Sequence, residues 1–177
     1  HTARIAYTET NHPNIPASFV GVGGKATDYK MFSIPFDLQS GSINFIFNEL
    51  GVADNTQWRI VQYITSSTSY SDATSISRGT GYWINTKTAP SAISVEGATT
   101  PNDTKASEFQ MALKTGWNLI GNPYPFAISW TTVKAANANI GDIKTYNGSF
   151  NTDNTLSPFE AGFVLLNGDN LTITIPF

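Results

Sequence analysis

The sequence predicts an all-β protein made of two pseudo-repeated, sandwich-like β lobes, each with one short helix. Short apolar or alternating runs, bounded by Gly, Pro, Asn and Ser, recur along the 177 residues, and this pattern is typical of β-strands. Runs with helical periodicity are scarce and short. The order of the runs in the first half of the chain recurs in the second half, as expected for an internal repeat.

The first lobe is expected to contain one helix among its strands. The run INFIFNELG (43–51) places Ile46, Phe47 and Leu50 on one face and ends at Gly51, which is a natural helix stop. A polar loop is expected after the run WRIVQYI. The expected strands of this lobe cover 17–22, 30–36, 58–64, 81–86 and 91–96.

The second lobe is expected to repeat this order. Its helix is predicted at 129–138, because Ser129 is a suitable N-cap and the residues that follow are rich in Ala. A polar loop again follows the third strand. The expected strands cover 107–113, 117–121, 142–146, 161–166 and 170–175.

Matching residues support the repeat and divide the chain. Pro35 matches Pro123, Tyr63 matches Tyr146, and the pair Gly81-Tyr82 matches Gly162-Phe163. The stretch between the lobes is polar, contains a proline and has no apolar period, which is typical of a linker. The predicted division is an N-terminal tail at 1–16, lobe one at 17–98, a linker at 99–106 and lobe two at 107–177.

The composition favours a secreted or cell-surface β protein. Charged residues make up only 13% of the chain, so Ser, Thr, Asn and Gly must supply most of the surface polarity. The net charge is -3 and there is no basic run, so we expect no nucleic-acid partner. No apolar run approaches the roughly 18 residues of a spanning helix, so we expect no membrane insertion. Because the chain begins at His1 and shows no signal peptide, we expect a processed product or an excised piece.

The stretch GWNLIGNPYPFAISW (116–130) concentrates tryptophan, proline, glycine and asparagine. Its segment 122–125 must be a turn, because two prolines remove backbone donors and fix the chain direction. The turn joins a strand to the helix that begins near Ser129, and lobe one has a related proline corner. We therefore interpret this stretch as a folding corner rather than as a site of chemistry.

The runs DYKMFSIPFDL, WRIVQY, GTGYWI and LKTGWNLIGNPYPFAISW resemble a module of large secreted proteins from Bacteroidetes-type bacteria. The resemblance covers residues 28 to 166. It implies a secreted or cell-surface setting, often associated with type IX secretion and with adhesive or sugar-active neighbours, but it implies no catalytic residues. The second glycine–aromatic corner of the family resembles PGQGF, whereas this chain has Phe159 in place of the first glycine.

The sequence predicts that the protein is not an enzyme. His1 and His12 both lie in the expected tail, where nothing would orient them. The run VGVGGK (20–25) lacks the following helix of a phosphate loop. No cofactor is expected. Zinc is excluded by the position of the histidines and the lack of cysteine. The metal site left open is a calcium site built from Asp142, Asp153 and Asp169 with asparagine or backbone oxygens. Paired carboxylates for glycoside hydrolysis are also unexpected, because the candidates are scattered: Asp37, Glu49, Glu96, Glu108, Asp142 and Glu160.

The aromatic residues divide into expected core residues and candidate binding residues. Trp58, Trp83 and Trp117 lie within apolar strands, so we expect them to be buried. Trp130 and Tyr124 flank the proline turn, and Tyr70 lies in a hydroxyl-rich loop, so we expect these three to be partly exposed. Such rings stack on sugars, while amides and guanidinium groups bond the hydroxyls. The candidates for that second role are Asn122, Asn85, Arg59 and Gln62.

Two functions remain open from the sequence. The first is a non-catalytic structural or adhesive module of a bacterial surface or secreted protein, with neighbouring domains or subunits as partners. The terminal run LTITIPF would then offer a strand edge for pairing with another chain. The alternative is a carbohydrate-binding module that binds glycans through Trp130, Tyr124, Tyr70 and Asn122.

Overall fold

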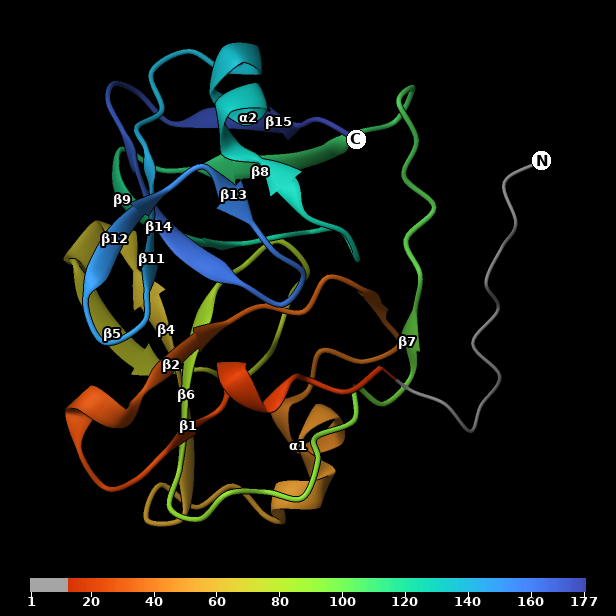
Figure 1. The fold of residues 1–177 in the computed structure, drawn as a ribbon, viewed down its shortest axis with the longest axis vertical. Helices are drawn as coiled ribbons and strands as arrows, with labels where there is room; N and C mark the ends of the chain where they lie inside the picture. Colours follow the sequence, from red (N-terminus) through yellow and green to blue (C-terminus); the bar gives the residue numbers. More distant parts are fainter. Residues whose placement is uncertain (1–12) are drawn as a thin grey trace.

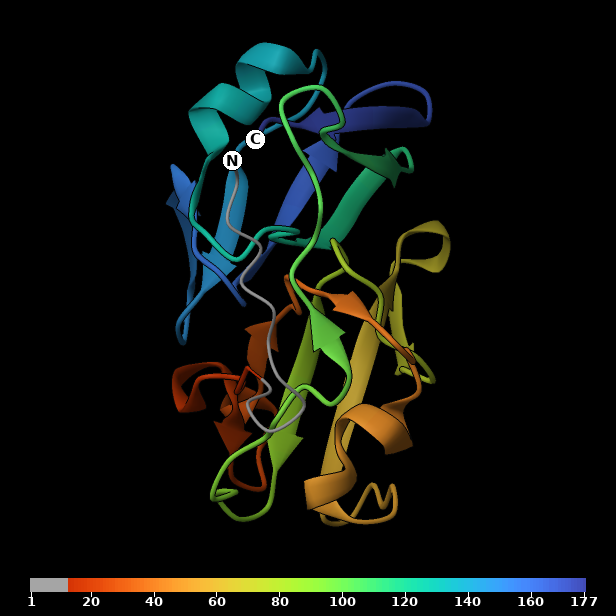
Figure 2. The ribbon, with the colours of Figure 1, turned by 90° about the vertical axis from the view of Figure 1, so that its right-hand side faces the viewer.

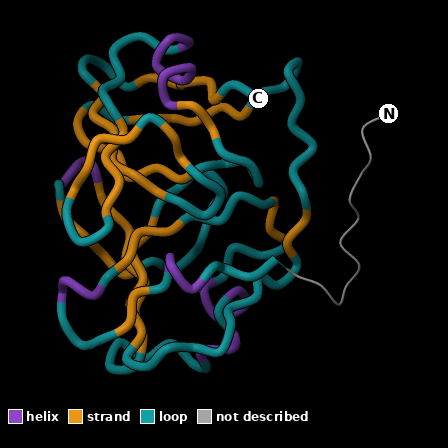
Figure 3. Tube along the Cα trace, viewed as in Figure 1, coloured by secondary structure: helices purple, strands orange, loops and turns teal. Residues whose placement is uncertain are grey.

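The computed structural model describes residues 13–177, and it is an all-β fold with a few short helices, as the sequence predicts. Two lobes lie one above the other along the long axis of the molecule (Figures 1 and 2). Strands run through the middle of the molecule, and α2 lies at the outer end of lobe two (Figure 3).

Lobe one is built around one sheet in which the strands follow the order β2-β6-β4-β5 with antiparallel neighbours. A further short strand, β1, pairs in parallel with the end of β6. Short helical turns connect β2 to β4. The bounds are β1 Gly21–Val22, β2 Lys30–Phe32, α1 Ile43–Ile46, η3 Asn48–Leu50, β4 Trp58–Ile64, β5 Ser69–Asp72 and β6 Tyr82–Thr86.

Lobe two repeats this topology, which confirms the predicted repeat. Its sheet has the order β9-β14-β11-β12, again with antiparallel neighbours. Its helix α2 connects β9 to β11, the same connection that carries α1 in lobe one. The N-cap is Ser129, whose hydroxyl accepts a hydrogen bond from the Thr132 backbone N–H. The bounds are β9 Gly116–Gly121, α2 Trp130–Ala136, β11 Ile143–Tyr146, β12 Phe150–Asp153 and β14 Ala161–Leu166.

Small strand pairs complete both lobes. In lobe two, β8 pairs with β15; in lobe one, the segment before β2 pairs with the segment after β6 through a bridge between Asn14 and Ser94. Ile15 is buried, so residues 13–16 pack on lobe one rather than forming a tail. The remaining bounds are η1 Ala17–Phe19, η2 Ala26–Asp28, β3 Asp37–Leu38, η4 Thr65–Ser67, β7 Ala98–Thr99, β8 Phe109–Leu113, β10 Ile128–Ser129, β13 Thr155–Leu156 and β15 Leu171–Ile175.

Some local predictions differ from the structure. The strand expected at 17–22 is a helical turn followed by the two residues of β1, and the one expected at 91–96 is reduced to a single bridge. The polar loops expected after β4 and β11 contain strands β5 and β12. Both were missed because their side chains are mainly polar, and the pairing with β4 and β11 stabilises them.

The register of the repeat corrects one residue match. Ser33 donates its backbone N–H to the Phe159 carbonyl at 2.8 Å, and Gly121 donates likewise to the Gly79 carbonyl at 2.9 Å. These equivalent bonds make Ser33 correspond to Gly121 and Gly79 to Phe159. Gly81 therefore corresponds to Ala161, not to Gly162 as the sequence match implied. The matches of Pro35 with Pro123 and of Tyr63 with Tyr146 agree with this register.

Each lobe has its own apolar core, and a third cluster joins them. Phe32 and Ile84 are fully buried in the core of lobe one, while Trp130 and Ile143 are buried in that of lobe two. The joining cluster draws on the inner faces of both sheets. It consists of Met31, Val61 and Trp83 from lobe one and of Leu119, Ala161 and Phe163 from lobe two.

Each lobe also contributes a short segment that pairs with the other lobe at this boundary. The segment before β6 bonds to β9, and the segment before β14 bonds to Ser33, which directly follows β2. The ring of Phe159, from lobe two, lies in the core of lobe one, 5.8 Å from the Phe36 ring between centroids. The backbones approach closely here, since a Cβ on Gly121 would lie 2.1 Å from the Ser33 Cβ. The two lobes are therefore interlocked.

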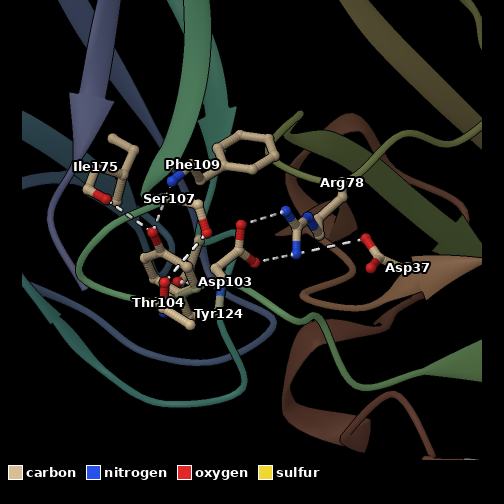
Figure 4. Close-up of polar contacts among 9 residues, drawn as sticks. Asp37, Arg78, Asp103, Thr104, Ser107, Phe109, Tyr124 and Ile175 are labelled. Carbon is tan, nitrogen blue, oxygen red and sulfur yellow. Dashed lines mark hydrogen bonds and ion pairs between the residues drawn. The ribbon is translucent and has the colours of Figure 1, made fainter.

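A partly buried ion pair ties the predicted linker to lobe one (Figure 4). Arg78 donates to both carboxylate oxygens of Asp103, at 2.6 and 3.1 Å, and lies 3.4 Å from an Asp37 oxygen. Its guanidinium also covers the Phe109 ring of lobe two, 4.5 Å from the centroid. This part of the linker is thus held firmly against both lobes.

Candidate functional site

Two of the predicted binding rings are core residues. Trp130 is only 1% exposed, and its indole Nε1 donates to the Gly141 carbonyl at 3.0 Å. Tyr124 is fully buried; its hydroxyl donates to the Ile175 carbonyl at 2.7 Å and accepts from the Phe109 N–H at 2.9 Å (Figure 4). The expectation that both are exposed is wrong, because each ring fills the core while its polar atom bonds buried backbone.

Asn122 is a structural residue as well. It is fully buried, and its Nδ2 donates to the carbonyls of Phe126 and Leu156 at 2.7 and 2.8 Å. Its Oδ1 accepts from the Tyr124 N–H at 2.8 Å. All three bonds hold the proline turn, so this amide has no free group for a ligand. The corner at 122–125 is a folding device, as interpreted from the sequence.

For the other residues singled out in the sequence, the observed exposure agrees with the expectation in some cases and differs in others. Tyr70 is 52% exposed, as expected, and Trp58 and Trp83 are buried, as expected. Trp117 was expected in the core but is 39% exposed, because it lies at the open end of β9 on the face that meets the other lobe. Gln62 is partly buried and donates to the Ser71 hydroxyl at 3.2 Å.

Aromatic side chains of both lobes meet at the boundary and form what we call the aromatic seam. The members correspond in pairs under the repeat: one residue of each pair comes from lobe one and the other from lobe two. The seam comprises Tyr29 and Trp117, Tyr63 and Tyr146, Tyr70 and Phe150, and Trp83 and Phe163.

Phe163 is the centre of the seam. Its ring lies 5.0 Å from Tyr63, 5.9 Å from Phe150 and 6.4 Å from Trp117 between centroids. The interplanar angles in the seam lie between 60° and 88°. Such edge-to-face packing is favourable for the rings themselves, but it leaves no coplanar pair of the kind that a sugar platform uses.

Part of the seam reaches the surface. Phe150 is 54% exposed, and together with Tyr70 and Trp117 it leaves apolar ring surface open to solvent. Burial raises the pKa of the Tyr70 phenol, although the neighbouring Trp83 indole opposes part of this rise. A cleft of about 370 Å³ between the lobes opens beside Tyr63. Sequence reasoning missed Phe150 because its strand was interpreted as a polar loop.

Comparison with protein-family models, with curated proteins and with solved structures finds no match. The resemblance to a secreted bacterial module therefore stays a prediction.

A second candidate site is a polar cavity of about 350 Å³ in lobe one, between the turn after β1, the loop before β4 and the end of β6. Two residues that the sequence suggested for ligand bonding, Asn85 and Arg59, line it beside Tyr29 and Trp58. The Asn85 Nδ2 donates to the Gly23 carbonyl at 3.0 Å. In contrast, the buried Asn85 Oδ1 and Trp58 Nε1 have no hydrogen-bond partner within residues 13–177.

The acidic residues considered for calcium do not gather in the structure. In residues 13–177, no group of three or more His, Cys, Asp and Glu is close enough to hold a metal ion. Asp142 instead pairs with Lys134 at 2.6 Å, and Asp153 accepts from the backbone of the following turn. His1 and His12 lie outside the described residues.

Glu160 is a partly buried acidic side chain next to the lobe boundary. Burial raises the pKa of its carboxyl, while the hydrogen bond that its Oε2 accepts from the Ser157 N–H opposes the rise. The other candidate carboxylates do not join it: Asp37 lies beside Arg78, and Glu49 bonds Ser94.

Of the helices in residues 13–177, none has the length and apolarity needed to cross a bilayer.

Proposed function

We propose that this chain is a non-catalytic structural module of an extracellular or cell-surface bacterial protein, and that it docks onto neighbouring modules of its own kind through the aromatic seam. The extracellular setting is supported by the low share of charged residues, 13%, and by the Ser-, Thr- and Asn-rich surface. The resemblance to secreted bacterial modules points the same way.

The observation that carries the proposal is the open ring surface of Tyr70, Trp117 and Phe150. Exposed aromatic clusters of this kind are enriched at protein interfaces, where they contribute a large contact area at low entropic cost. These three exposed members carry no formal charge, so two such patches can meet without like-charge repulsion. A second copy of the module is therefore a suitable partner.

The terminal strand is a less suitable contact than the sequence suggested. Asn137 occupies the outer edge of β15, because its side chain donates to the Thr174 carbonyl at 2.7 Å and accepts from the Thr174 N–H at 2.8 Å. The inner edge of β15 is paired with β8. An incoming strand would have to displace these bonds.

Sedimentation velocity across a concentration series tests the proposal. The parent chain is expected to self-associate between about 10 and 500 μM, as weak interfaces of small area do. Phe150→Ser is expected to shift the association at least about tenfold toward the monomer. The control is Phe126→Ser, which removes a ring of 38% exposure outside the seam. A parent that stays monomeric throughout, or equal effects of the two variants, contradicts the proposal.

Carbohydrate binding remains a second candidate function, now favoured by the polar cavity rather than by the rings named from the sequence. The cavity combines the amide of Asn85, the guanidinium of Arg59 and the aromatic ring of Tyr29. Its volume, about 350 Å³, is within the range of small-ligand sites.

A further inference from the structure

The repeat identifies which polar residues of lobe one the fold itself does not require. Asn85 of β6 corresponds to Leu165 of β14, and the next residue, Thr86, corresponds to Leu166. The same topology therefore forms in lobe two with apolar side chains at both positions. The Thr86 hydroxyl is explained locally, because it donates to the Gly21 carbonyl at 3.0 Å and so holds β1.

Local hydrogen bonding accounts for only one of the two polar atoms of the Asn85 side chain. Its Nδ2 holds the turn after β1 through the Gly23 carbonyl, but its Oδ1 is buried without a partner. Burying an acceptor without a hydrogen bond costs about 1–3 kcal/mol. An asparagine that carries this cost, at a position where the repeat uses leucine, indicates a requirement other than folding.

The cavity beside Asn85 is an addition to the repeat. Strand β1 and the turn after it form one wall, and lobe two, all of which is described, has no counterpart of β1. The opposite wall is the loop before β4, which contributes the polar side chains of Asn55, Thr56 and Gln57. The extra segment thus converts the end of a sheet into a hollow.

The charged residues of this cavity are all basic. Lys25, Arg59 and Lys87 line it, whereas no carboxylate does. Three carboxylates lie behind the lining and are already hydrogen-bonded: Asp72 accepts from Arg59, at 2.5 Å, and from Asn55, Asp54 accepts from Thr56, and Asp28 accepts from the Lys25 backbone N–H. The Thr56 hydrogen bonds lower the pKa of the Asp54 carboxyl, and Lys87 is close enough to lower it further. Lys25 and Lys87 form no ion pair within residues 13–177. The lining therefore favours a ligand with negative charge.

We propose that the polar cavity of lobe one binds an acidic saccharide. The cations would pair with the carboxylate, the amides and hydroxyl of Asn55, Thr56, Gln57 and Asn85 would bond the sugar hydroxyls, and the Tyr29 ring would contact the apolar face of the sugar. This inference rests on the second candidate function, carbohydrate binding, and it specifies both the position and the ligand class.

Titration calorimetry with the full 177-residue chain tests the inference. The probes are tetragalacturonate and sialyllactose, with the fully methyl-esterified tetragalacturonate and inorganic sulfate as comparisons. At least one acidic oligosaccharide is expected to bind with a Kd below about 1 mM, which corresponds to about -4 kcal/mol. The neutral ester is expected to bind at least about tenfold more weakly.

Substitutions locate the binding. Lys87→Gln and Arg59→Gln are each expected to weaken binding about tenfold, because each removes one charge-assisted contact. Asn85→Leu, which inserts the residue of the other repeat, is expected to abolish it. The matched control is Lys105→Gln, the same charge change on an exposed residue outside the cavity. If Asn85→Leu fails to fold, as judged by circular dichroism, the two charge variants decide.

The outcomes distinguish the acidic ligand class from carbohydrate binding in general. Equal binding of the acid and its neutral ester overturns the acidic class but leaves carbohydrate binding standing. No binding of any saccharide overturns both. Sulfate that displaces the saccharide at equal concentration, or a control variant that loses as much affinity as Lys87→Gln, overturns the inference, since the chain would then respond to charge alone.

Discussion

Close backbone contacts at the lobe boundary restrict individual residues more than the sequence suggests. Gly81 has no room for a side chain, because a Cβ there would lie 2.7 Å from the Ile120 carbonyl oxygen and 2.9 Å from the Ala161 Cβ. Phe159 adopts a φ of 65°, a left-handed conformation that glycine adopts at the equivalent position, Gly79, with a φ of 80°. Lobe two thus tolerates backbone strain at Phe159 to keep a ring in the core of lobe one.

Phe159→Gly is expected to destabilise the protein by about 2–4 kcal/mol. Loss of a buried phenylalanine ring costs about 3–5 kcal/mol, and relief of the left-handed conformation returns about 1 kcal/mol. Urea unfolding followed by tryptophan fluorescence measures the difference. A variant as stable as the parent would show that the ring contributes nothing to the core of lobe one.

Glu160→Gln is expected to change the pH dependence of stability. Burial raises the folded-state pKa of Glu160, so its protonated form stabilises the fold at low pH, and this stabilisation is lost as pH rises through the raised pKa. Glutamine keeps an acceptor for the Ser157 N–H and has no charge to desolvate. The melting temperature of the variant relative to the parent should therefore be higher at pH 7.5 than at pH 4. No change in this difference between the two pH values contradicts the prediction.

At the scale of elements, β9 shows why an apolar strand need not be buried along its length. Ile120 faces the core of lobe two, whereas Trp117 and Leu119 face the boundary with lobe one. The boundary covers Leu119 but not the end of the strand, so Trp117 stays partly exposed. In α2, by contrast, Trp130 and Val133 lie on the single face that packs on the core.

Paired tryptophan substitutions test this difference. Trp130→Ala is expected to cost about 3–5 kcal/mol, as for a large ring in a well-packed core. Trp117→Ala is expected to cost only about 1–2 kcal/mol, because it loses a partly exposed ring and its cross-strand contacts. Denaturant unfolding of both variants gives the comparison. Equal losses would mean that Trp117 is a core residue after all.

At the scale of the whole molecule, the exchanged segments make the two lobes one folding unit. The ring of Phe159 completes the core of lobe one, and the backbone before β6 completes the edge of β9 in lobe two. Arg78 and Asp103 add a partly buried ion pair, and removing one partner would leave the other charge partly desolvated and unpaired. Neither lobe keeps all its contacts when the other unfolds.

Substitutions at equivalent core positions are therefore expected to act on one common transition. Ile60 and Ile143 correspond under the repeat and are both buried. Ile60→Ala and Ile143→Ala should each lower the free energy of unfolding by about 2–5 kcal/mol. Calorimetry should show one peak, displaced as a whole in both variants. Two peaks, of which each variant moves only one, would show that the lobes unfold independently.

The sequence by itself determined the fold class, the repeat, the two helices and the function of the proline corner as a turn. These features depend on local physics: the period of apolar residues, the stop at Gly51, the cap at Ser129 and the restricted dihedrals of proline. Such signals act within a few residues of the chain, so they are readable without knowledge of the fold.

The tertiary structure alone decided which aromatic rings are exposed, and hence where the candidate sites lie. The inner faces of the two sheets pack against each other, so their strands are apolar on both faces and alternation no longer distinguishes core from surface. Tyr124 and Trp130 lie in the core, whereas Trp117 and Phe150 lie partly exposed at the surface. The cavity beside Asn85 likewise forms only when β1, β4 and β6, distant in the chain, lie side by side.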